Sequence, residues 1–259
     1  MIFNPGFDIR PKTNPMGFEY GPGVFGPEVE NRALDSIRKS LRDRGCSGPD
    51  PVYSIAMDVG KSEHLPQLKR HHLLFGAVTY AAGRLGDEPV RSQGHIHRIS
   101  PFSGWSTPEV YEIWSGKAII YMQETALDLP GRCFAVLANP GDVVIVPPAW
   151  VHATISADPQ EPLTFGAWCD REYGFEYDGV RQHNGLAWFP ILDKSEQIIW
   201  IKNPNYQDSN LIVKNPEKYS QFGLNYSKPV YTQFEENPDL FLFVPQPQRV
   251  KEIWKGFIP

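Results

Sequence analysis

The sequence contains little cysteine, no basic runs and no long apolar segment. Cys46, Cys133 and Cys169 lie far apart and form no CxxC pair, which argues against a disulfide framework and favours a reducing, cytoplasmic location. The net charge is −5 and no cluster of Lys and Arg suggests nucleic-acid binding. No apolar stretch reaches the ~20 residues of a membrane span, and the first residues lack the apolar core of a signal peptide. We therefore expect no nucleic acid and no membrane among the partners.

Proline, glycine and aromatic residues are abundant instead, with 25 prolines, 22 glycines and 13% aromatic residues. This composition favours many short strands joined by turns over long helices. One exception lies near the start of the chain, in PEVENRALDSIRKSLRDRG. Pro27 suits a first helical turn, and Ala33, Ile37 and Leu41 recur at helical spacing, so we expect a helix near 27–44.

The middle of the chain predicts a β domain. Between about residues 51 and 190, turn residues separate apolar segments at the spacing expected of a sandwich or barrel. The segments are PVYSIAMDV, HLLFGAVTYAAG, EVYEIW, KAIIYMQE, CFAVLA, DVVIVPP, HATIS and PLTFGAWC. In the tail, QIIWIKNP and LIVKNP are expected to form short strands, and RVKEIWKGF a short helix.

Most of the chemistry is concentrated in GHIHRISPFSGWSTPEVYEIWSG, residues 94–116. His95 and His97 are two residues apart, so on a strand both point to the same face. Glu109 supplies a carboxylate, and PGDVVIVPPAWVH places His152 just after a proline-containing turn. Three imidazoles and one carboxylate converging inside a barrel would bind a divalent first-row metal ion. The competing interpretation is that these are unrelated polar side chains on strand surfaces.

The full arrangement resembles the two motifs of the cupin superfamily. A glycine directly precedes HxH, Glu109 is followed by Gly116, and the second motif runs from Gly141 to His152. One departure is the insert RISPFSGWSTP between His97 and Glu109, which is longer than in most cupins. A loop rich in turn-forming residues can lengthen without moving the strands that it joins.

Within that superfamily, TYAAGRLGDEPVRSQGHIH, PEVYEIWSGKAIIYMQE and PGDVVIVPPAWVHATIS resemble the cupin-type glucose-6-phosphate isomerases of archaea and some bacteria. The likeness covers roughly residues 70–205. It implies an all-β fold, the cupin double-stranded β-helix or jelly-roll barrel, over residues 51–205. An N-terminal extension with one helix (1–50) and a C-terminal extension packed on the barrel (206–259) complete the expected architecture.

The resemblance also implies an activity and a set of site residues. The activity is the interconversion of glucose 6-phosphate and fructose 6-phosphate by a cytoplasmic homodimer of glycolysis and gluconeogenesis. The cofactor is one divalent metal ion per chain, Fe²⁺ in preference to Mn²⁺, Zn²⁺ or Ni²⁺. The implied metal ligands are His95, His97, Glu109 and His152, and the residues expected to hold the sugar phosphate are Thr79, Ser92, Gly94 and Tyr111.

Glu109 is the candidate catalytic residue. Tyr111 shares its strand face, whereas Glu112 has the opposite parity and should face away. Two routes remain open from the sequence. A base removes the C2 proton and returns it to C1 through an enediolate, or a hydride shifts directly between the two carbons.

Two positions depart from the family pattern. Trp168 stands near an expected tyrosine, and Phe175 near an expected histidine. Alternatives therefore stay open: another metal-dependent cupin enzyme, acting on a different sugar or as an oxygenase, or a non-catalytic sugar-phosphate-binding cupin. The neighbouring arginines, Arg84, Arg91 and Arg98, are expected in solvent because nothing in the sequence directs them inward.

Overall fold

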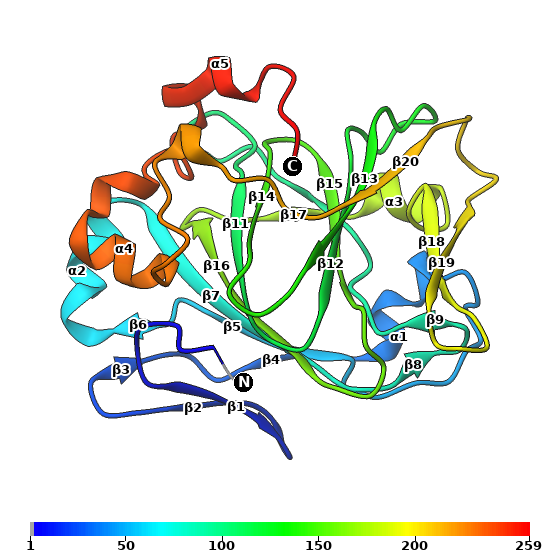
Figure 1. The fold of residues 1–259 in the computed structure, drawn as a ribbon, viewed down its shortest axis with the longest axis horizontal. Helices are drawn as coiled ribbons and strands as arrows, with labels where there is room; N and C mark the ends of the chain where they lie inside the picture. The colour runs from blue at the N-terminus through cyan, green and yellow to red at the C-terminus, as the bar shows by residue number, and fades with distance from the viewer. Residues whose placement is uncertain (1–2) are drawn as a thin grey trace.

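The structure, a computed structural model, describes residues 3–259 and contains two β-sheets that face each other (Figure 1). The larger sheet contains, in spatial order, β14 (Val143–Val146), β11 (Glu109–Ser115), β16 (Leu163–Asp170), β7 (Leu73–Tyr80), β5 (Tyr53–Met57) and β4 (Glu30–Arg32). The smaller sheet contains β15 (Val151–Ser156), β12 (Ala118–Gln123), β13 (Cys133–Ala138) and β20 (Leu211–Lys214). One hydrophobic cluster takes side chains from both sheets, for example Phe165 and Met122. The architecture is the expected all-β cupin barrel.

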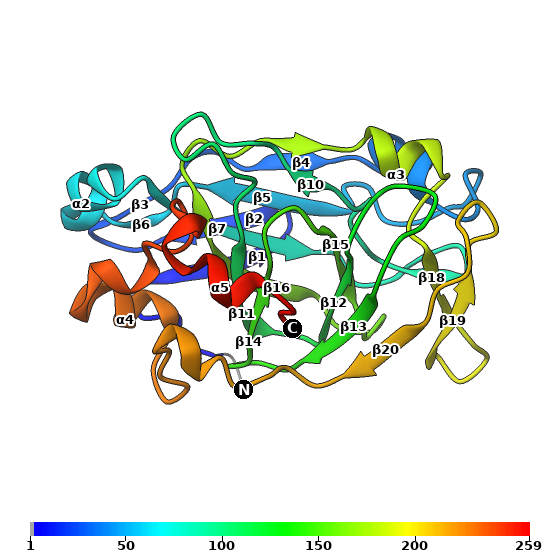
Figure 2. The ribbon, with the colours of Figure 1, turned by 90° about the horizontal axis from the view of Figure 1, so that it is seen from above.

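Paired short strands and short helices surround the two sheets. The strand pairs are β1 (Ile9–Thr13) with β2 (Met16–Tyr20), β3 (Val24–Phe25) with β6 (Gly60–Lys61), β8 (Arg84–Leu85) with β9 (Glu88–Pro89), β10 (Ile96–His97) with β17 (Phe175–Glu176), and β18 (Trp188–Leu192) with β19 (Ile198–Lys202). The helices are α1 (Leu34–Ile37), α2 (Leu65–Arg70), α3 (Asp178–Gln182), α4 (Val230–Glu236) and α5 (Lys251–Trp254). In both ribbon views, α4 and α2 lie at one end of the molecule and the β18–β19 hairpin lies at the other (Figure 2).

Every strand segment expected from the sequence forms a strand in the structure. The side chains of β16 show that the larger sheet is buried on both faces. Phe165 and Cys169 point into the barrel, whereas Trp168 points to the opposite face. There a second hydrophobic cluster joins the sheet to the C-terminal segment and to Phe7 near the N-terminus. Trp168 stacks on Tyr231 of α4, with ring centroids 5.6 Å apart and planes 12° apart.

The helix expected over 27–44 is wrong in extent. Residues Glu30–Arg32 form β4 and pair with β5, α1 covers only Leu34–Ile37, and a short 3₁₀ turn follows over Arg38–Ser40. Leu34 and Ile37 are buried in the barrel cluster, so the apolar spacing marked real core positions. The open edge of β5 accepts residues 30–32 as a strand, and this tertiary pairing overrides their helical propensity.

Strands from outside residues 51–205 also join the two sheets. β4 precedes the expected barrel and forms an edge of the larger sheet, and β20 follows it and pairs with β13 in parallel. Both flanking segments therefore contribute to the sheets as well as packing on the outside.

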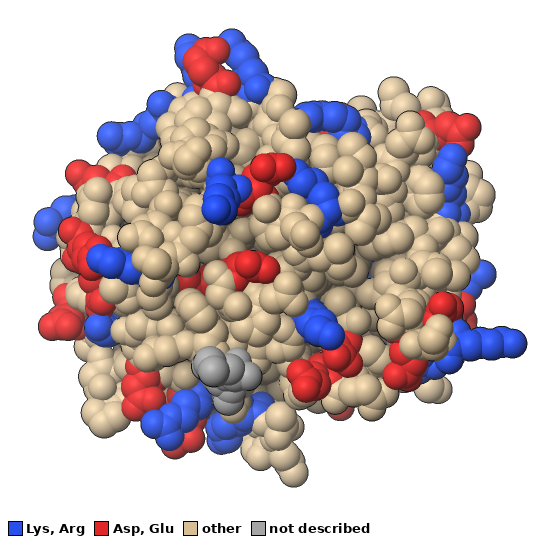
Figure 3. Space-filling model, viewed as in Figure 1, with Lys and Arg blue, Asp and Glu red and all other residues tan. Residues whose placement is uncertain are grey.

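The charged surface is mixed in sign on the face drawn in Figure 3, where Lys and Arg lie among Asp and Glu. Among residues 3–259, no helix combines the length and the apolar composition that a membrane crossing would require.

Candidate metal centre and its cavity

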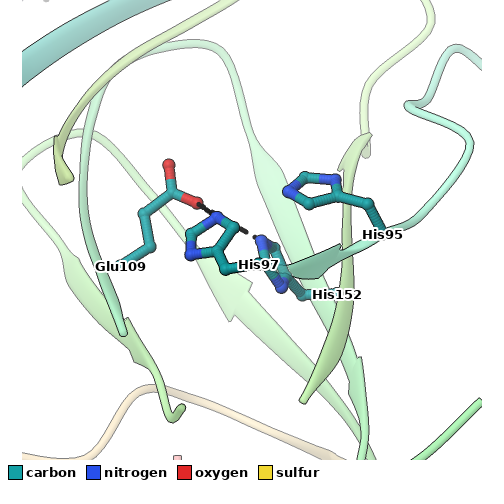
Figure 4. Close-up of side chains that lie close together, drawn as sticks. All are labelled: His95, His97, Glu109 and His152. Carbon is teal, nitrogen blue, oxygen red and sulfur yellow. Dashed lines mark ion pairs between the residues drawn. The ribbon is translucent and has the colours of Figure 1, made fainter. Parts of the chain in front are cut away.

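The structure brings four potential metal ligands together from three different strands and one adjoining residue (Figure 4). His97 lies on β10, His95 directly precedes that strand, Glu109 begins β11 and His152 lies on β15. Glu109 Oε2 lies 3.3 Å from Nε2 of His97 and 3.3 Å from Nε2 of His152. One donor atom from each of the four residues lies within 4.8 Å of every other.

Backbone carbonyls orient two of these imidazoles. Nδ1 of His97 is 2.8 Å from the Thr107 carbonyl, and Nδ1 of His152 is 3.1 Å from the Trp150 carbonyl. A proton on Nδ1 donates to each carbonyl and leaves Nε2 with a free lone pair that faces the centre. The Nε2 atoms of His95, His97 and His152 are buried and have no hydrogen-bond partner among the described residues. Nitrogens of this kind fit a metal ion.

The protonation states also suit metal binding. Burial lowers the pKa of His95 well below its ordinary value, and the neighbouring His152 and His97 lower it further. Burial likewise lowers the pKa of His152. For Glu109, burial opposes ionisation, but the imidazoles of His152 and His97 outweigh it and hold the pKa well below its ordinary value. Neutral imidazoles and an ionised carboxylate are the forms that bind a cation.

A β-bulge sets which residues of the histidine segment face inward. The Ser92 amide donates to the Thr154 carbonyl, and His95 pairs with His152. The histidine segment therefore advances three residues, from Ser92 to His95, while β15 advances two, from Thr154 to His152. The extra residue is accommodated next to Gly94, which has φ +90° and whose Cβ, if present, would lie 2.6 Å from Leu186 Cδ2. Without the bulge, Ser92 and His95 would point to opposite faces.

Two residues of the cluster, His95 and Glu109, line a cavity inside the barrel. Its empty space is about 600 Å³, including the open mouth. The lining contains Arg32, Tyr53, Ile55, Met57, Val78, Tyr80, Ser92, Gln93, His95, Glu109, Tyr111, Thr154, Phe165, Cys169, Phe175 and Tyr177. The Tyr111 hydroxyl donates to Glu109 Oε2 at 2.9 Å, and the Cys169 thiol lies 3.4 Å from Oε1 of the same carboxylate. The two carboxylate oxygens therefore face different partners.

The sequence matches a family of known proteins. Residues 32–207 match the family described as Glucose-6-phosphate isomerase (GPI). The chain belongs to the glucose-6-phosphate isomerase family. Among its relatives are the glucose-6-phosphate isomerase of Sinorhizobium medicae (26% identical, covering 67% of this chain and 70% of that protein) and that of Thermococcus gammatolerans (25% identical, covering 66% and 79%).

Among solved structures, an oxalate oxidase is similar with a TM-score of 0.37 and 13% identity, over 49% of this chain and 55% of that one. A variant of Bacillus subtilis oxalate decarboxylase gives a TM-score of 0.35 and 15% identity, over 59% and 30%.

The residues expected to hold the sugar phosphate divide into two groups in this family member. Ser92 and Tyr111 line the cavity. Thr79 lies on the opposite face of β7 from the lining residue Val78, and its hydroxyl is 3.1 Å from that of Thr164. Gly94 is buried against Leu186 and is absent from the lining, so its structural contribution is the bulge.

The two departures from the family pattern have different settings. Trp168 is fully buried outside the barrel, where Tyr231 of the C-terminal segment covers it. Phe175 lies inside the site, with its ring centroid 4.5 Å from that of His95. Tyr177 follows on the same side, 5.9 Å from His95. Only Phe175 therefore changes the surroundings of the cluster.

Arg91 lies in the interior, contrary to the expectation that it lies in solvent. It is fully buried, and its Nε donates to Glu88 Oε2 at 2.6 Å. Its other nitrogens donate to the carbonyls of Ser40 and Ser92. The GDE segment thus supplies the buried acid that holds Arg91. The i, i+3 spacing of Glu88 and Arg91 could have indicated an ion pair between them. The burial of Arg91, however, results from contacts with chain segments that are remote in the sequence.

Sequence reasoning did not find Arg32, Tyr53, Tyr80, Thr154 and Cys169 as cavity residues. Thr154 could have been found, because it lies two residues beyond His152 on the same strand and therefore shares its face. Arg32 had no such signal, since its segment was expected to be helical.

Proposed function

We propose that this protein interconverts glucose 6-phosphate and fructose 6-phosphate and needs one divalent metal ion per chain. The observation that carries the proposal is the convergence of four potential metal ligands in a glucose-6-phosphate isomerase family member, with His95 and Glu109 in the lining of the cavity. The proposed ligands are His95, His97, Glu109 and His152. A bound divalent ion would act as a Lewis acid toward the carbonyl of the open-chain sugar.

We assign the proton transfer to Glu109. Its Oε2 faces the histidines and accepts the Tyr111 hydroxyl, whereas Oε1 faces Cys169 in the cavity wall. Oε1 is therefore the oxygen available to take the C2 proton and to return it to C1. Ser92 supplies a hydroxyl group for the sugar phosphate, and Tyr111 can do so by turning its hydroxyl proton from Glu109 to the phosphate.

The donor set of three imidazoles and one carboxylate accepts Fe²⁺, Mn²⁺, Zn²⁺ and Ni²⁺, and supply in the cell decides among ions of similar affinity. We propose Fe²⁺ as the resident ion. We also propose a cytoplasmic role in glycolysis and gluconeogenesis. The three free, buried cysteines are consistent with a reducing compartment.

We propose that the chain acts as a homodimer. Exposed apolar side chains gather on neighbouring strands of the smaller sheet and on the β18–β19 hairpin, among them Leu137, Ile212 and Ile199. Exposed apolar groups of this kind are typical of protein–protein contacts. A monomeric mass in solution would contradict this part of the proposal.

A second candidate function is supported by Phe175. A ring that cannot exchange protons lies where the family pattern has a histidine, next to His95. This favours a cupin that acts on a different sugar, or one that binds sugar phosphate without converting it. Consumption of dioxygen would identify an oxygenase instead.

Metal analysis of the purified protein, combined with a coupled assay on fructose 6-phosphate, tests the proposal. We expect about one ion per chain, loss of turnover on chelation and recovery when metal is returned. Activity that survives complete metal removal would contradict the metal requirement. Absence of any turnover in the metal-loaded protein would favour the second candidate.

The Glu109→Gln variant tests the proton route. It keeps the size and one oxygen donor but removes the charge and the base. We expect turnover to fall by roughly 10²–10⁴-fold even in excess metal, as is typical of losing a general base. Glu161→Gln, at an exposed position, is the matched control. If added metal restores most of the turnover of Glu109→Gln, and no solvent deuterium enters C2, the hydride route operates.

A further inference from the structure

Among residues 3–259, the lining of the cavity includes one basic side chain of the lysine or arginine type, that of Arg32 in β4. Its backbone is fixed in the larger sheet, because Arg32 pairs with Tyr53 of β5 and its carbonyl accepts the Val52 amide at 2.8 Å. About a fifth of its side chain is exposed. The guanidinium therefore belongs to the wall of the cavity and still reaches solvent at the mouth.

The hydrogen-bonding capacity of this guanidinium is only partly used. One terminal nitrogen lies 2.6 Å from Glu30 Oε1, but Nε is buried and has no partner among residues 3–259. Glu30 itself is 65% exposed. An ion pair with such an exposed partner contributes little and can be exchanged for another anion. The guanidinium thus has one buried donor without a partner and a second donor whose partner can be replaced. Two such donors suit an anion that is bound through two of its oxygens.

Arg32 is also close to the ligand cluster. Arg32, His95 and Tyr177 all line the same cavity, and the ring centroid of Tyr177 lies 5.9 Å from that of His95. One small ligand can therefore span both groups.

The proposed reaction needs an anion contact of this kind. Its substrate carries a dianionic phosphate, and two residues expected to hold that phosphate, Thr79 and Gly94, do not line the cavity. A planar guanidinium binds two phosphate oxygens at once, whereas a hydroxyl group has only one proton to donate.

We propose that Arg32 binds the phosphate of the substrate and that Glu30 occupies the guanidinium until the substrate replaces it. This inference rests on the proposed function. It makes Arg32 the residue that selects phosphorylated over unphosphorylated sugars.

Arg32→Gln in the metal-loaded protein tests the proposal. Loss of hydrogen bonds to a charged group should raise KM for fructose 6-phosphate by about 10- to 100-fold, with a much smaller change in kcat. Any slow turnover of fructose, which has no phosphate, should be unaffected. Arg32→Lys should recover part of the KM loss, because it restores the charge but not the two-point contact. The control is Arg84→Gln, an exposed arginine beside Glu196 outside the cavity lining.

Glu30→Gln provides an independent variant. Removing the competing carboxylate should lower KM for fructose 6-phosphate and tighten inhibition by inorganic phosphate, each by a few-fold. An unchanged or weakened response to phosphate in Glu30→Gln would overturn the role given to Glu30.

Calorimetric titration with inorganic phosphate separates failure of this inference from failure of the proposed function. If the wild-type protein does not isomerise fructose 6-phosphate but binds phosphate, and Arg32→Gln abolishes that binding, the anion contact stands while the proposed function fails. If wild type and Arg32→Gln bind phosphate equally, or if their KM values agree within two-fold, the role of Arg32 is overturned whatever the activity.

Discussion

Replacing Arg91 by methionine should lower the free energy of unfolding by about 3–5 kcal/mol, the range for removing one partner of a buried ion pair. The variant leaves Glu88, which is 1% exposed, with its remaining hydrogen bond from the Arg42 amide. It also leaves the carbonyls of Ser40 and Ser92 without the donors that Arg91 supplies. The methionine fills most of the volume, so the loss comes from the uncompensated carboxylate and the unpaired carbonyls.

Urea unfolding followed by circular dichroism is the assay. With a slope of about 2–3 kcal/mol/M, a loss of 3–5 kcal/mol lowers the midpoint by roughly 1–2.5 M. A double-mutant cycle with Glu88→Gln isolates the pair. Once Arg91 is gone, neutralising Glu88 should cost nothing or should stabilise the protein, because no buried charge then remains.

The control is Arg84→Met, at an exposed arginine 3.9 Å from Glu196. It should change stability by less than about 0.5 kcal/mol. If Arg91→Met and Arg84→Met have the same midpoint, or if the costs of Arg91→Met and Glu88→Gln simply add, the argument from the buried ion pair is wrong.

Three further outcomes follow from particular residues. Gly94→Ala should destabilise the protein by about 1–3 kcal/mol and reduce the bound metal, because the new Cβ would lie 2.6 Å from Leu186 Cδ2. The control is Gly104→Ala, where φ is also positive but the space is open, and it should cost less stability and leave the metal content unchanged. Equal effects of the two variants would contradict the packing argument. Burial raises the pKa of Glu112 to about 8 from an ordinary 4.5. Between these values the folded protein keeps a proton that the unfolded chain releases, so the free energy of unfolding should fall by up to about 1.4 kcal/mol per unit as pH rises from 6.5 to 8; the fall should be absent in Glu112→Gln, and an identical slope in that variant would exclude Glu112 as its origin. Trp168→Phe should lower stability but leave KM for fructose 6-phosphate unchanged, since the ring packs outside the barrel, and a raised KM would place Trp168 at the substrate.

The alternation of side chains along a strand correctly predicted which way several side chains point. Glu112 faces away from the cavity, as its spacing from Glu109 predicts, and accepts the Val230 amide of α4 at 2.7 Å and the Trp114 indole at 3.1 Å. His95 and His97 point toward the same centre. These predictions needed only the two-residue repeat of a strand.

Strand parity alone does not place a residue where the structure interrupts the two-residue repeat, or where both faces of a strand are covered. Ser92 and His95 face one cavity because of the bulge beside Gly94, and a count along the sequence would have separated them. The family resemblance placed Thr79 at the substrate, but β7 directs its neighbours Val78 and Tyr80 inward instead. Which face of a strand is interior depends on what covers each side, and here both sides are covered.

Local properties of the sequence were enough to predict the β architecture and the four candidate metal ligands, because turn residues, strand periodicity and the HxH, Glu and His spacing can be recognised along the chain. The tertiary structure decided how the cavity is completed. Arg32 reaches it from β4, at the edge of the sheet, and Arg91 is buried because Glu88 and the carbonyl of Ser40 meet it in space. Contacts between segments remote in the sequence are set by packing, and no short pattern of residues records them.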